Sequence, residues 1–255
     1  AIEVFHNFTL LHDDIMDNAP LRRGNPTVHE KWNSNVAILS GDTMMIQSYQ
    51  LMAKVDSNSL KDVIDVFSKA ALEVCEGQQL DMDFETQDKV ELVDYMKMIE
   101  YKTAVLLAAS LKIGAIISGG NKEQQNHLYQ FGLNMGIAFQ LKDDLLDAFG
   151  NHKDFGKQVG GDILSNKKTF LYLKALQLAD DSTKMKLQDY YTTSNNSERK
   201  VNVVKDIFKN LNIQKHTIDM MKAYYTKAMK HLDAIDSDNK APLILFSEKL
   251  MERIS

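Results

Sequence analysis

The stretch that decides the fold runs from residue 139 to residue 147 and reads Phe-Gln-Leu-Lys-Asp-Asp-Leu-Leu-Asp. It ends a longer region, residues 122–149, whose apolar spacing predicts a helix. Asp143 and Asp147 are four positions apart, so they lie on one face of that helix. Like charges at this spacing repel each other, and burial would raise their pKa values. Such a pair on a largely apolar helix makes sense if a divalent cation compensates it.

The same pattern occurs a second time, near the start of the chain. Residues 13–17 read Asp-Asp-Ile-Met-Asp, which places Asp13 and Asp17 on one helix face. Hard oxygen ligands select Mg²⁺ or Ca²⁺, and Mg²⁺ typically takes one or two carboxylates together with substrate phosphates. Two such helix ends facing one another could hold a diphosphate between several Mg²⁺ ions. The alternative is that each aspartate run is a solvated acidic face.

Each aspartate run is followed by a basic loop. Arg22 and Arg23, two of only four arginines in the chain, follow the first run. Lys157 and Lys167 lie in the glycine-rich loop after the second. Arginine binds phosphate in a bidentate manner, and glycine lets a backbone approach a ligand closely. This doubled arrangement of acid followed by base favours a metal-bridged polyphosphate.

Proline and glycine positions indicate the architecture. The three prolines are Pro20, Pro26 and Pro242, so none interrupts a helix between residues 27 and 241. Helical spacing recurs between the glycine breaks, and strand-like alternation is scarce. The sequence therefore predicts one all-α domain over residues 1–255, with helices near 1–18, 33–55, 58–86, 91–118, 122–149, 167–179, 183–193, 197–210, 214–235 and 240–253.

Composition narrows the class of protein. A net charge of -5 and a pI near 5.8 argue against binding to nucleic acid. The single cysteine, Cys75, excludes an intrachain disulfide and fits a reducing compartment. The most apolar stretch, residues 103–120, is interrupted by Lys112 and reads better as a buried helix than as a membrane span. No signal peptide pattern opens the chain, so we expect a soluble, cytoplasmic protein.

Together these motifs resemble the trans-isoprenyl diphosphate synthase (polyprenyl synthetase) family, short-chain type, over essentially the whole chain. Residues 6–17, followed by Arg22 and Arg23, are similar to its first aspartate-rich region, and residues 139–147 to its second. Residues 77–81 (Gly-Gln-Gln-Leu-Asp) and 101–103 (Tyr-Lys-Thr) match between them, in the family's order. The resemblance implies a single-domain helical bundle around a central cavity, the isoprenoid synthase type, usually a homodimer. It also implies a prenyltransferase that condenses isopentenyl diphosphate with an allylic diphosphate.

By resemblance, each matching residue has a role. About three Mg²⁺ ions would be ligated by one group of aspartates, supported by a second; the ligands are Asp13, Asp17 and Asp143, and the supporting residues are Asp14, Asp144 and Asp147. The allylic diphosphate would be held by Arg22, Lys102, Lys157 and Lys167, and isopentenyl diphosphate by His6 and Arg23. Gln78 and Asp81 would also lie at the substrate site. The family stabilises the allylic cation and assists the final proton loss at the positions of Thr103 and Gln140.

One motif of the family does not occur in this chain. It is a Gly-x-Lys-x-x-Arg-Pro segment upstream, whose lysine and arginine bind isopentenyl diphosphate in the family. The helical register is already running at residue 1, without a capping residue ahead of it. We therefore expect that the family's N-terminal helices are missing from this sequence.

Product length is predicted from two residues before the first aspartate run. In the family, the growing tail arrives at the positions of Phe8 and Thr9. Phe8 lies about 7.5 Å of helix rise below Asp13, where a bulky ring would stop elongation early. This resembles geranylgeranyl (C20) synthases. The alternatives are a farnesyl (C15) or longer-chain synthase, or a non-catalytic subunit of a heteromeric synthase. A class I terpene cyclase is disfavoured because the second aspartate run is intact.

Overall fold

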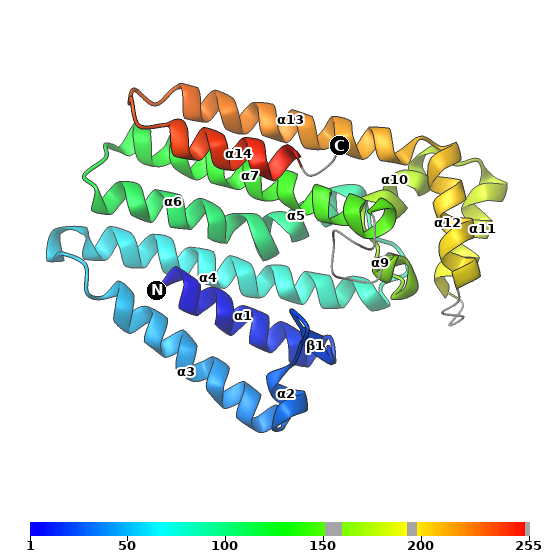
Figure 1. Ribbon diagram of the computed structural model, residues 1–255, viewed down its shortest axis with the longest axis horizontal. Coiled ribbons are helices and arrows are strands. Elements are labelled where there is room, and N and C mark those ends of the chain that lie inside the picture. Colours follow the sequence, from blue (N-terminus) through cyan, green and yellow to red (C-terminus); the bar gives the residue numbers. More distant parts are fainter. Residues whose placement is uncertain (151–159, 193–197, 253–255) are drawn as a thin grey trace.

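The computed structural model describes residues 1–150, 160–192 and 198–252, and within these ranges the protein is a bundle of helices (Figure 1). The predicted all-α fold is therefore confirmed. The helices are α1 (Ile2–Met16), α2 (Val28–Lys31), α3 (Ser34–Met52), α4 (Ser57–Thr86), α5 (Leu92–Ile99), α6 (Val105–Ile117), α7 (Lys122–Phe149), α9 (Gly161–Leu164), α10 (Phe170–Leu178), α11 (Asp181–Thr192), α12 (Glu198–Asn210), α13 (Ile213–Asp233) and α14 (Ala241–Glu252).

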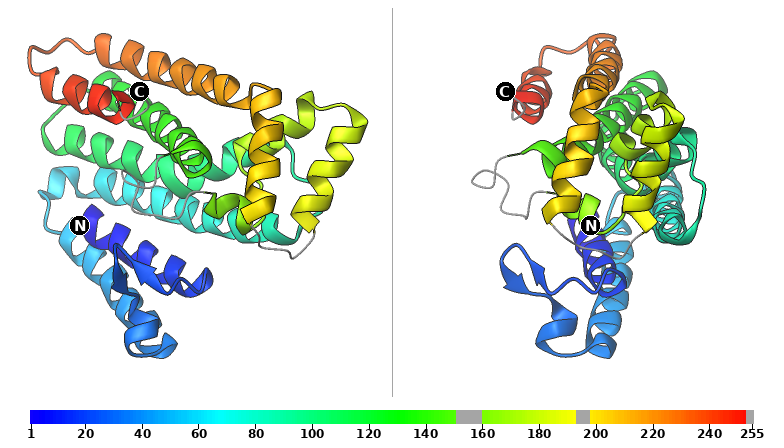
Figure 2. Two further views of the ribbon diagram at one scale, coloured as in Figure 1. Left: turned by 45° about the vertical axis from the view of Figure 1, so that its right-hand side comes forward. Right: turned by 90° about the vertical axis from the view of Figure 1, so that its right-hand side faces the viewer.

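The helices stack in layers across the molecule. The α1–α3 pair lies on one side of α4, and α13 and α14 lie on the other, beyond α6 and α7 (Figure 2). Helix α7 is central because it packs against both α6 and α13. One apolar cluster fills the space between α1, α4 and α6, and a larger one surrounds the second half of α7. No helix in the described parts of the chain has the length and apolar character needed to cross a membrane.

Local sequence explains several of the helix starts. The side chain of Asn33 accepts a hydrogen bond from the backbone N–H of Val36 at 2.9 Å and so caps α3. Asn121 and Gln124 form a reciprocal capping box at the start of α7, with bonds of 2.9 and 3.0 Å. These caps satisfy N–H groups that have no partner inside the helix. Apart from the helix expected over residues 91–118, each predicted helix is present, with bounds within three residues of those expected.

The predicted helix over residues 91–118 is not continuous, and this prediction needs correction. A π-helical turn, η1 (Glu100–Ala104), separates α5 from α6. Two glycines allow neighbouring helices to approach it closely. A Cβ on Gly77 of α4 would lie 2.2 Å from the backbone nitrogen of Lys102, and one on Gly136 of α7 would lie 2.5 Å from Ala104 Cα. The turn is therefore fixed by the backbones of two flanking helices.

The close contact at Gly136 gives a matched pair of expectations. Gly136→Ala should lower the free energy of unfolding by about 1–3 kcal/mol, because the new methyl group meets the backbone of Ala104. Gly114→Ala is the control, since a Cβ there meets no atom within 4 Å. On the exposed side of α6 it should stabilise the protein by about 0.4–1 kcal/mol. Urea unfolding of both variants checks this, and equal effects would contradict the packing argument.

Some elements were not predicted from the sequence. These are the one-turn helices α2 and α9 and a small antiparallel hairpin of β1 (Leu21–Arg22) and β2 (Asn25–Pro26). All three are too short for a periodic signal. The hairpin and α9 nevertheless matter for the site, because each follows one of the two aspartate runs.

Candidate active site

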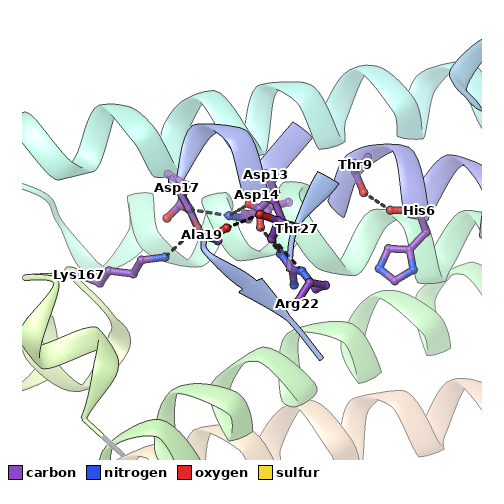
Figure 3. Close-up of polar contacts among 11 residues, drawn as sticks. His6, Thr9, Asp13, Asp14, Asp17, Ala19, Arg22, Thr27 and Lys167 are labelled. Carbon is purple, nitrogen blue, oxygen red and sulfur yellow. Dashed lines mark hydrogen bonds and ion pairs between the residues drawn. The ribbon is translucent and has the colours of Figure 1, made fainter. Parts of the chain in front are cut away.

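The hairpin after α1 places Arg22 beside the first aspartate run. Its two-residue turn consists of Arg23 and Gly24, with φ of 53° and 78°, the left-handed pair that a tight hairpin requires. At the base of the loop, the buried hydroxyl of Thr27 donates to the backbone oxygen of Ala19 at 2.7 Å (Figure 3). The loop is thereby folded back on the end of α1.

The two adjacent arginines have different positions. Arg22 donates from Nη2 to Asp14 Oδ1 at 2.6 Å and to Asp13 Oδ2 at 3.2 Å, while its Nε donates to Asp14 at 3.0 Å. The hydrogen bond to Asp14 is the main reason that the pKa of Arg22 is raised. Arg23 lies exposed in the turn, where its backbone oxygen accepts a hydrogen bond from Asn25 Nδ2 at 3.3 Å, and its side chain contacts none of the aspartates in the described parts of the chain. Only Arg22 therefore joins the acidic cluster.

Lys102 connects the first aspartate run to α4. Its ammonium group lies 2.6 Å from Asp81 Oδ2 and 3.1 Å from Asp13 Oδ1. Burial disfavours the charge on Lys102, but the carboxylates of Asp81 and Asp13 together outweigh it and raise the pKa of the lysine. Nearby, Gln78 Nε2 is buried without a hydrogen-bond partner among the described residues. A ligand in this space could accept that hydrogen bond.

Lys167, which lies after α9 and far from α1 in the sequence, contacts the same acidic cluster. Its Nζ lies 3.9 Å from Asp17 Oδ2 (Figure 3). Burial opposes its charge, yet Asp81 and Asp17 raise the pKa of Lys167 well above the ordinary value. Burial also raises the pKa of Asp17, and the charge of Lys167 counteracts this. The predicted partner Lys157 lies outside the described residues.

In the second aspartate run, Asp144 points into the protein. It is 4% exposed and accepts hydrogen bonds from the hydroxyl of Tyr95, from the backbone N–H of Phe170 at 3.3 Å and from Gln140 Nε2 at 3.3 Å. Burial raises the pKa of Asp144 to about 7, although the bonds from Tyr95 and Gln140 counteract it. Its neighbour Asp143 is only partly buried. The hydrogen bonds of Asp144 therefore fix α7 to its neighbours. The more exposed Asp143 is the aspartate of the pair that is accessible to a ligand.

Gln140 also connects this anchor to η1. The hydroxyl of Thr103 donates to Gln140 Oε1 at 3.1 Å, and Gln140 in turn donates to Asp144. The structure thus brings together Thr103 and Gln140, the two positions to which the resemblance assigned stabilisation of the allylic cation and the final proton loss. Because Lys102 is adjacent to Thr103, the same turn connects both aspartate runs.

Asp147 holds the short helix α9 against α7. Its Oδ2 accepts the backbone N–H of Asp162 at 3.0 Å, and its backbone oxygen accepts the N–H of Gly160 at 2.7 Å. The side chain of Asp162 is thereby held close to another carboxylate. Burial, together with the charge of Asp147, raises the pKa of Asp162 to about 8.

These two carboxyls make stability depend on pH. Asp144 and Asp162 have folded-state pKa values of about 7 and about 8, against an ordinary 3.8. Between about pH 4 and pH 8 the folded state thus binds more protons than the unfolded state, so stability falls as pH rises. Without Mg²⁺, unfolding from pH 5 to pH 8.5 should show this loss, and Asp162→Asn should lose less than the wild type. A larger loss in the variant would contradict the assignment.

A cavity of about 430 Å³ opens beside this cluster, between α1, α4, η1 and α6. Asp13 and Lys102 are at its polar side, and Phe8 and Thr9 line it along α1. Phe8 is 7% exposed, and the lining continues past it to Ile2. His6 lines the same cavity, away from the aspartates (Figure 3). The role of Phe8 as the stop to elongation stays a prediction.

The donor atoms suit Mg²⁺, as the chemistry of the cluster shows. Four carboxylates (Asp13, Asp14, Asp17 and Asp81) contact three basic side chains, so the atoms available to ligate a metal ion are hard carboxylate oxygens and the cations remain for phosphate oxygens. Within the described residues no three His, Cys, Asp or Glu side chains converge into a ready-made metal site. Mg²⁺ needs no such group, because it binds through one or two carboxylates with water and substrate phosphates. The residues present therefore fit the predicted ion.

Tyr95 is the functional-site residue that sequence reasoning missed. It is 2% exposed, and its hydroxyl donates to Asp144 across the site. Burial and the charge of Asp144 raise its own pKa well above the ordinary value. The available signal was its seven-residue spacing from Lys102, which is the spacing of one helix face. This spacing indicates the helix face on which Tyr95 lies, but it does not indicate that the Tyr95 hydroxyl contacts Asp144.

The fold and the site together define a class: a mainly helical protein with two aspartate-rich helix ends, the first of which carries basic residues and borders a mainly apolar cavity. The sequence profile of the family described as Polyprenyl synthetase matches residues 1–211. The chain belongs to the polyprenyl synthetase family. This confirms the resemblance inferred from the motifs.

Relatives and solved structures agree with this family. The chain is 44% identical over 179 residues to a geranylgeranyl diphosphate synthase of Methanosarcina mazei, covering 69% of this chain and 55% of that relative. It is 36% identical over 246 residues to a geranylgeranyl diphosphate synthase of Sulfolobus acidocaldarius, covering 95% and 74%. A crystal structure of geranylgeranyl pyrophosphate synthetase from Pyrococcus horikoshii superimposes with a TM-score of 0.92 at 35% identity, covering 98% of this chain and 77% of that one. The chain thus spans little more than half of the Methanosarcina relative.

Proposed function

We propose that this protein is a prenyltransferase that joins an allylic diphosphate to isopentenyl diphosphate. The observation that carries the proposal is Lys102, held between Asp13 and Asp81 at the polar side of the apolar cavity. A diphosphate with a hydrocarbon tail needs a charged site for its phosphates next to an apolar cavity for its tail. Family membership supports the same activity.

The protein residues bind and orient the allylic diphosphate. Arg22, Lys102 and Lys167 neutralise its oxygens, and Asp13, Asp17 and Asp143 would hold Mg²⁺ against it, with Asp14, Asp144 and Asp147 in support. When bound, Mg²⁺ supplies charge stabilisation to the departing pyrophosphate. Gln78 and Asp81 complete this end of the site, and the tail occupies the cavity beside Phe8 and Thr9.

The reaction needs a stabilised cation and a dry site. The allylic C–O bond breaks, and its electron pair leaves with pyrophosphate. The double bond of isopentenyl diphosphate, held by His6 and Arg23, supplies the electron pair of the new C–C bond. A proton is then lost to pyrophosphate, which leaves an allylic diphosphate five carbons longer. Thr103 lines the cavity and donates a hydrogen bond to Gln140, and we assign stabilisation of the cation to this pair. The apolar lining excludes water that would quench the cation.

We infer that the product is geranylgeranyl diphosphate (C20). Relatives with this name support the inference, although relatives named geranylfarnesyl diphosphate synthase also match. Phe8 is the residue on which the inference depends, because it lines the cavity five positions before Asp13, where a bulky ring would stop the tail. Farnesyl or longer products are the alternatives.

Phe8→Ala should therefore lengthen the product. Removing the ring enlarges the cavity along α1 and lets the tail extend toward Ile2. Products would be dephosphorylated and sized by chromatography, at a temperature at which wild type and variant are both folded. Phe139→Ala is the control, since Phe139 is 44% exposed and does not line the cavity. Unchanged product length in Phe8→Ala would show that the tail stops elsewhere.

We further infer that the protein is a homodimer joined through α3. This helix has one charged residue, Asp42, in its 19 positions. Its outer face carries a row at heptad spacing that includes Val36, Leu39 and Ile46, which are 39%, 66% and 57% exposed. A second copy of the same face would bury this row. Sedimentation of a monomer at micromolar concentration would contradict the inference.

We also infer where the protein is found. The single cysteine, Cys75, fits a reducing compartment, and we place the protein in the cytoplasm.

A product assay tests the proposed function. Purified protein would be incubated with Mg²⁺, isopentenyl diphosphate and farnesyl diphosphate, and the products sized after dephosphorylation. A C20 product supports the proposal, and its loss when Mg²⁺ is chelated supports the metal requirement. Binding of inorganic pyrophosphate with Mg²⁺, measured by calorimetry, serves as a second readout. Binding without any product would favour a non-catalytic subunit.

A further inference from the structure

The turn that presents Lys167 is bounded by two residues in the left-handed conformation. Gly160, before α9, has a φ of +82°, and Asn166, after it, has a φ of 59°. A non-glycine residue there is uncommon, although asparagine tolerates it better than most. Lys167 follows Asn166 directly, so the backbone of Asn166 sets the direction of the lysine. Asp147 holds this turn from the α7 side.

Helix α12 holds the same turn from the opposite side (Figure 1). The ammonium group of Lys200 donates to Asn166 Oδ1. The next residue, Val201, packs on Gly160 so closely that a Cβ there would lie 2.7 Å from Val201 Cγ1. Two consecutive residues of α12 thus contact both ends of the turn.

The position of Lys200 is itself constrained. It is 1% exposed, which is rare for lysine. Its Nζ lies 5.4 Å from the ring centre of Tyr191, and that ring stacks on Tyr172 with centres 3.9 Å apart. Burial of an ammonium group costs free energy, and a cation–π contact returns only part of it. A helix that needed only to pack here could use an apolar residue at lower cost.

We propose that Lys200 is a positioning residue: its bond to Asn166 fixes the left-handed turn that directs Lys167 toward the diphosphate. The connection from α12 to the ligand runs through one side-chain bond, the backbone of Asn166 and Lys167. The part that concerns the ligand rests on the proposed function. The part that concerns the turn does not.

Two variants separate this role from simple packing. Lys200→Met removes the charge and the donor but keeps an unbranched apolar chain. Lys205→Met is the matched control, because Lys205 lies on the same helix and also faces an aromatic ring, that of Phe149 at 5.8 Å. Asn166→Gly is the second variant. It removes the acceptor, while glycine adopts a positive φ without strain, so it keeps the proposal testable if Lys200→Met fails to fold.

The first readout is amide hydrogen exchange of residues 160–168, which requires no ligand. Lys200→Met and Asn166→Gly should accelerate exchange there, and Lys205→Met should not. The second readout is calorimetric binding of inorganic pyrophosphate with Mg²⁺, for which both variants should raise Kd about tenfold, or about 1.4 kcal/mol. In the Asn166→Gly background, Lys200→Met should add no further loss. A purely structural role would lower Tm and leave Kd unchanged.

The outcomes are distinguishable from failure of the proposed function. Unchanged exchange in Lys200→Met would overturn the proposal, as would faster exchange with unchanged pyrophosphate affinity. If the wild type binds no pyrophosphate but the variants still exchange faster, the hold on the turn is supported and the proposed function fails.

Discussion

Replacing Lys102 with alanine should lower kcat about 10²–10³-fold in the prenyl transfer assay. Lys102 is the ammonium group between Asp13 and Asp81, at the point where the pyrophosphate leaves in the proposed mechanism. Loss of one such preorganised group typically has an effect of this size on kcat. Because the group acts on the charge that develops in the transition state, KM should change less than kcat.

Lys97→Ala is the matched control for this prediction. Lys97 lies five residues earlier, on α5, where it is exposed and lies over the ring of Tyr101 at 5.2 Å. It should retain the activity of the wild type. If Lys102→Ala raised KM with little change in kcat, Lys102 would bind the ground state and the transition state equally. Equal loss in the two variants would show that the effect is not specific to the site.

Two adjacent aspartates should give opposite results when each is replaced with alanine. Asp144→Ala should lower the free energy of unfolding by about 3 kcal/mol, because the buried hydroxyl of Tyr95 and the N–H of Phe170 lose their acceptor. Asp143→Ala should change it by less than about 0.5 kcal/mol, since Asp143 is only partly buried. Urea unfolding of both variants measures the difference.

For enzymatic activity in the folded protein the order should be reversed, with Asp143→Ala having the larger effect and Asp144→Ala the smaller. Asp143 is the proposed Mg²⁺ ligand, so Asp143→Ala should remove most Mg²⁺-dependent activity from a protein that remains folded. The thermal shift produced in the wild type by Mg²⁺ and pyrophosphate should also be absent from this variant. If Asp143→Ala retained both the activity and the shift, the metal would be held by other residues.

The helices were predictable because each carries an apolar row at helical spacing, and caps such as Asn121 mark their starts. The aspartate runs were also predictable, since their spacing places the acids on one face. Which member of each adjacent pair turns inward was not. Asp13 and Asp14 differ by a single helix position, and packing around α1 decides that Asp14 is buried. That information lies in contacts between elements rather than in the local pattern.

Long-range contacts also explain the features that were missed. The bond from Tyr95 to Asp144 joins residues 49 positions apart. Arg22 contacts the aspartates whereas the side chain of Arg23 does not, and this difference depends on the hairpin turn at Gly24, where φ is positive. The π-helical turn depends on backbone contacts with Gly77 and Gly136. None of these is encoded by a run of neighbouring residues.

The π-helical turn also marks a place where the length of this chain can vary. Residues 100–104 accommodate one residue more than an α-helix would in the same rise. Deleting one residue there would make the turn α-helical and leave the later positions of α6 close to their present phase relative to α5. Ala108 and Ala109, now fully buried, would then keep their orientation. A deletion within α6 itself would instead rotate every later position by about 100°. Homologous proteins should therefore tolerate the loss of one residue in this turn more readily than within α6.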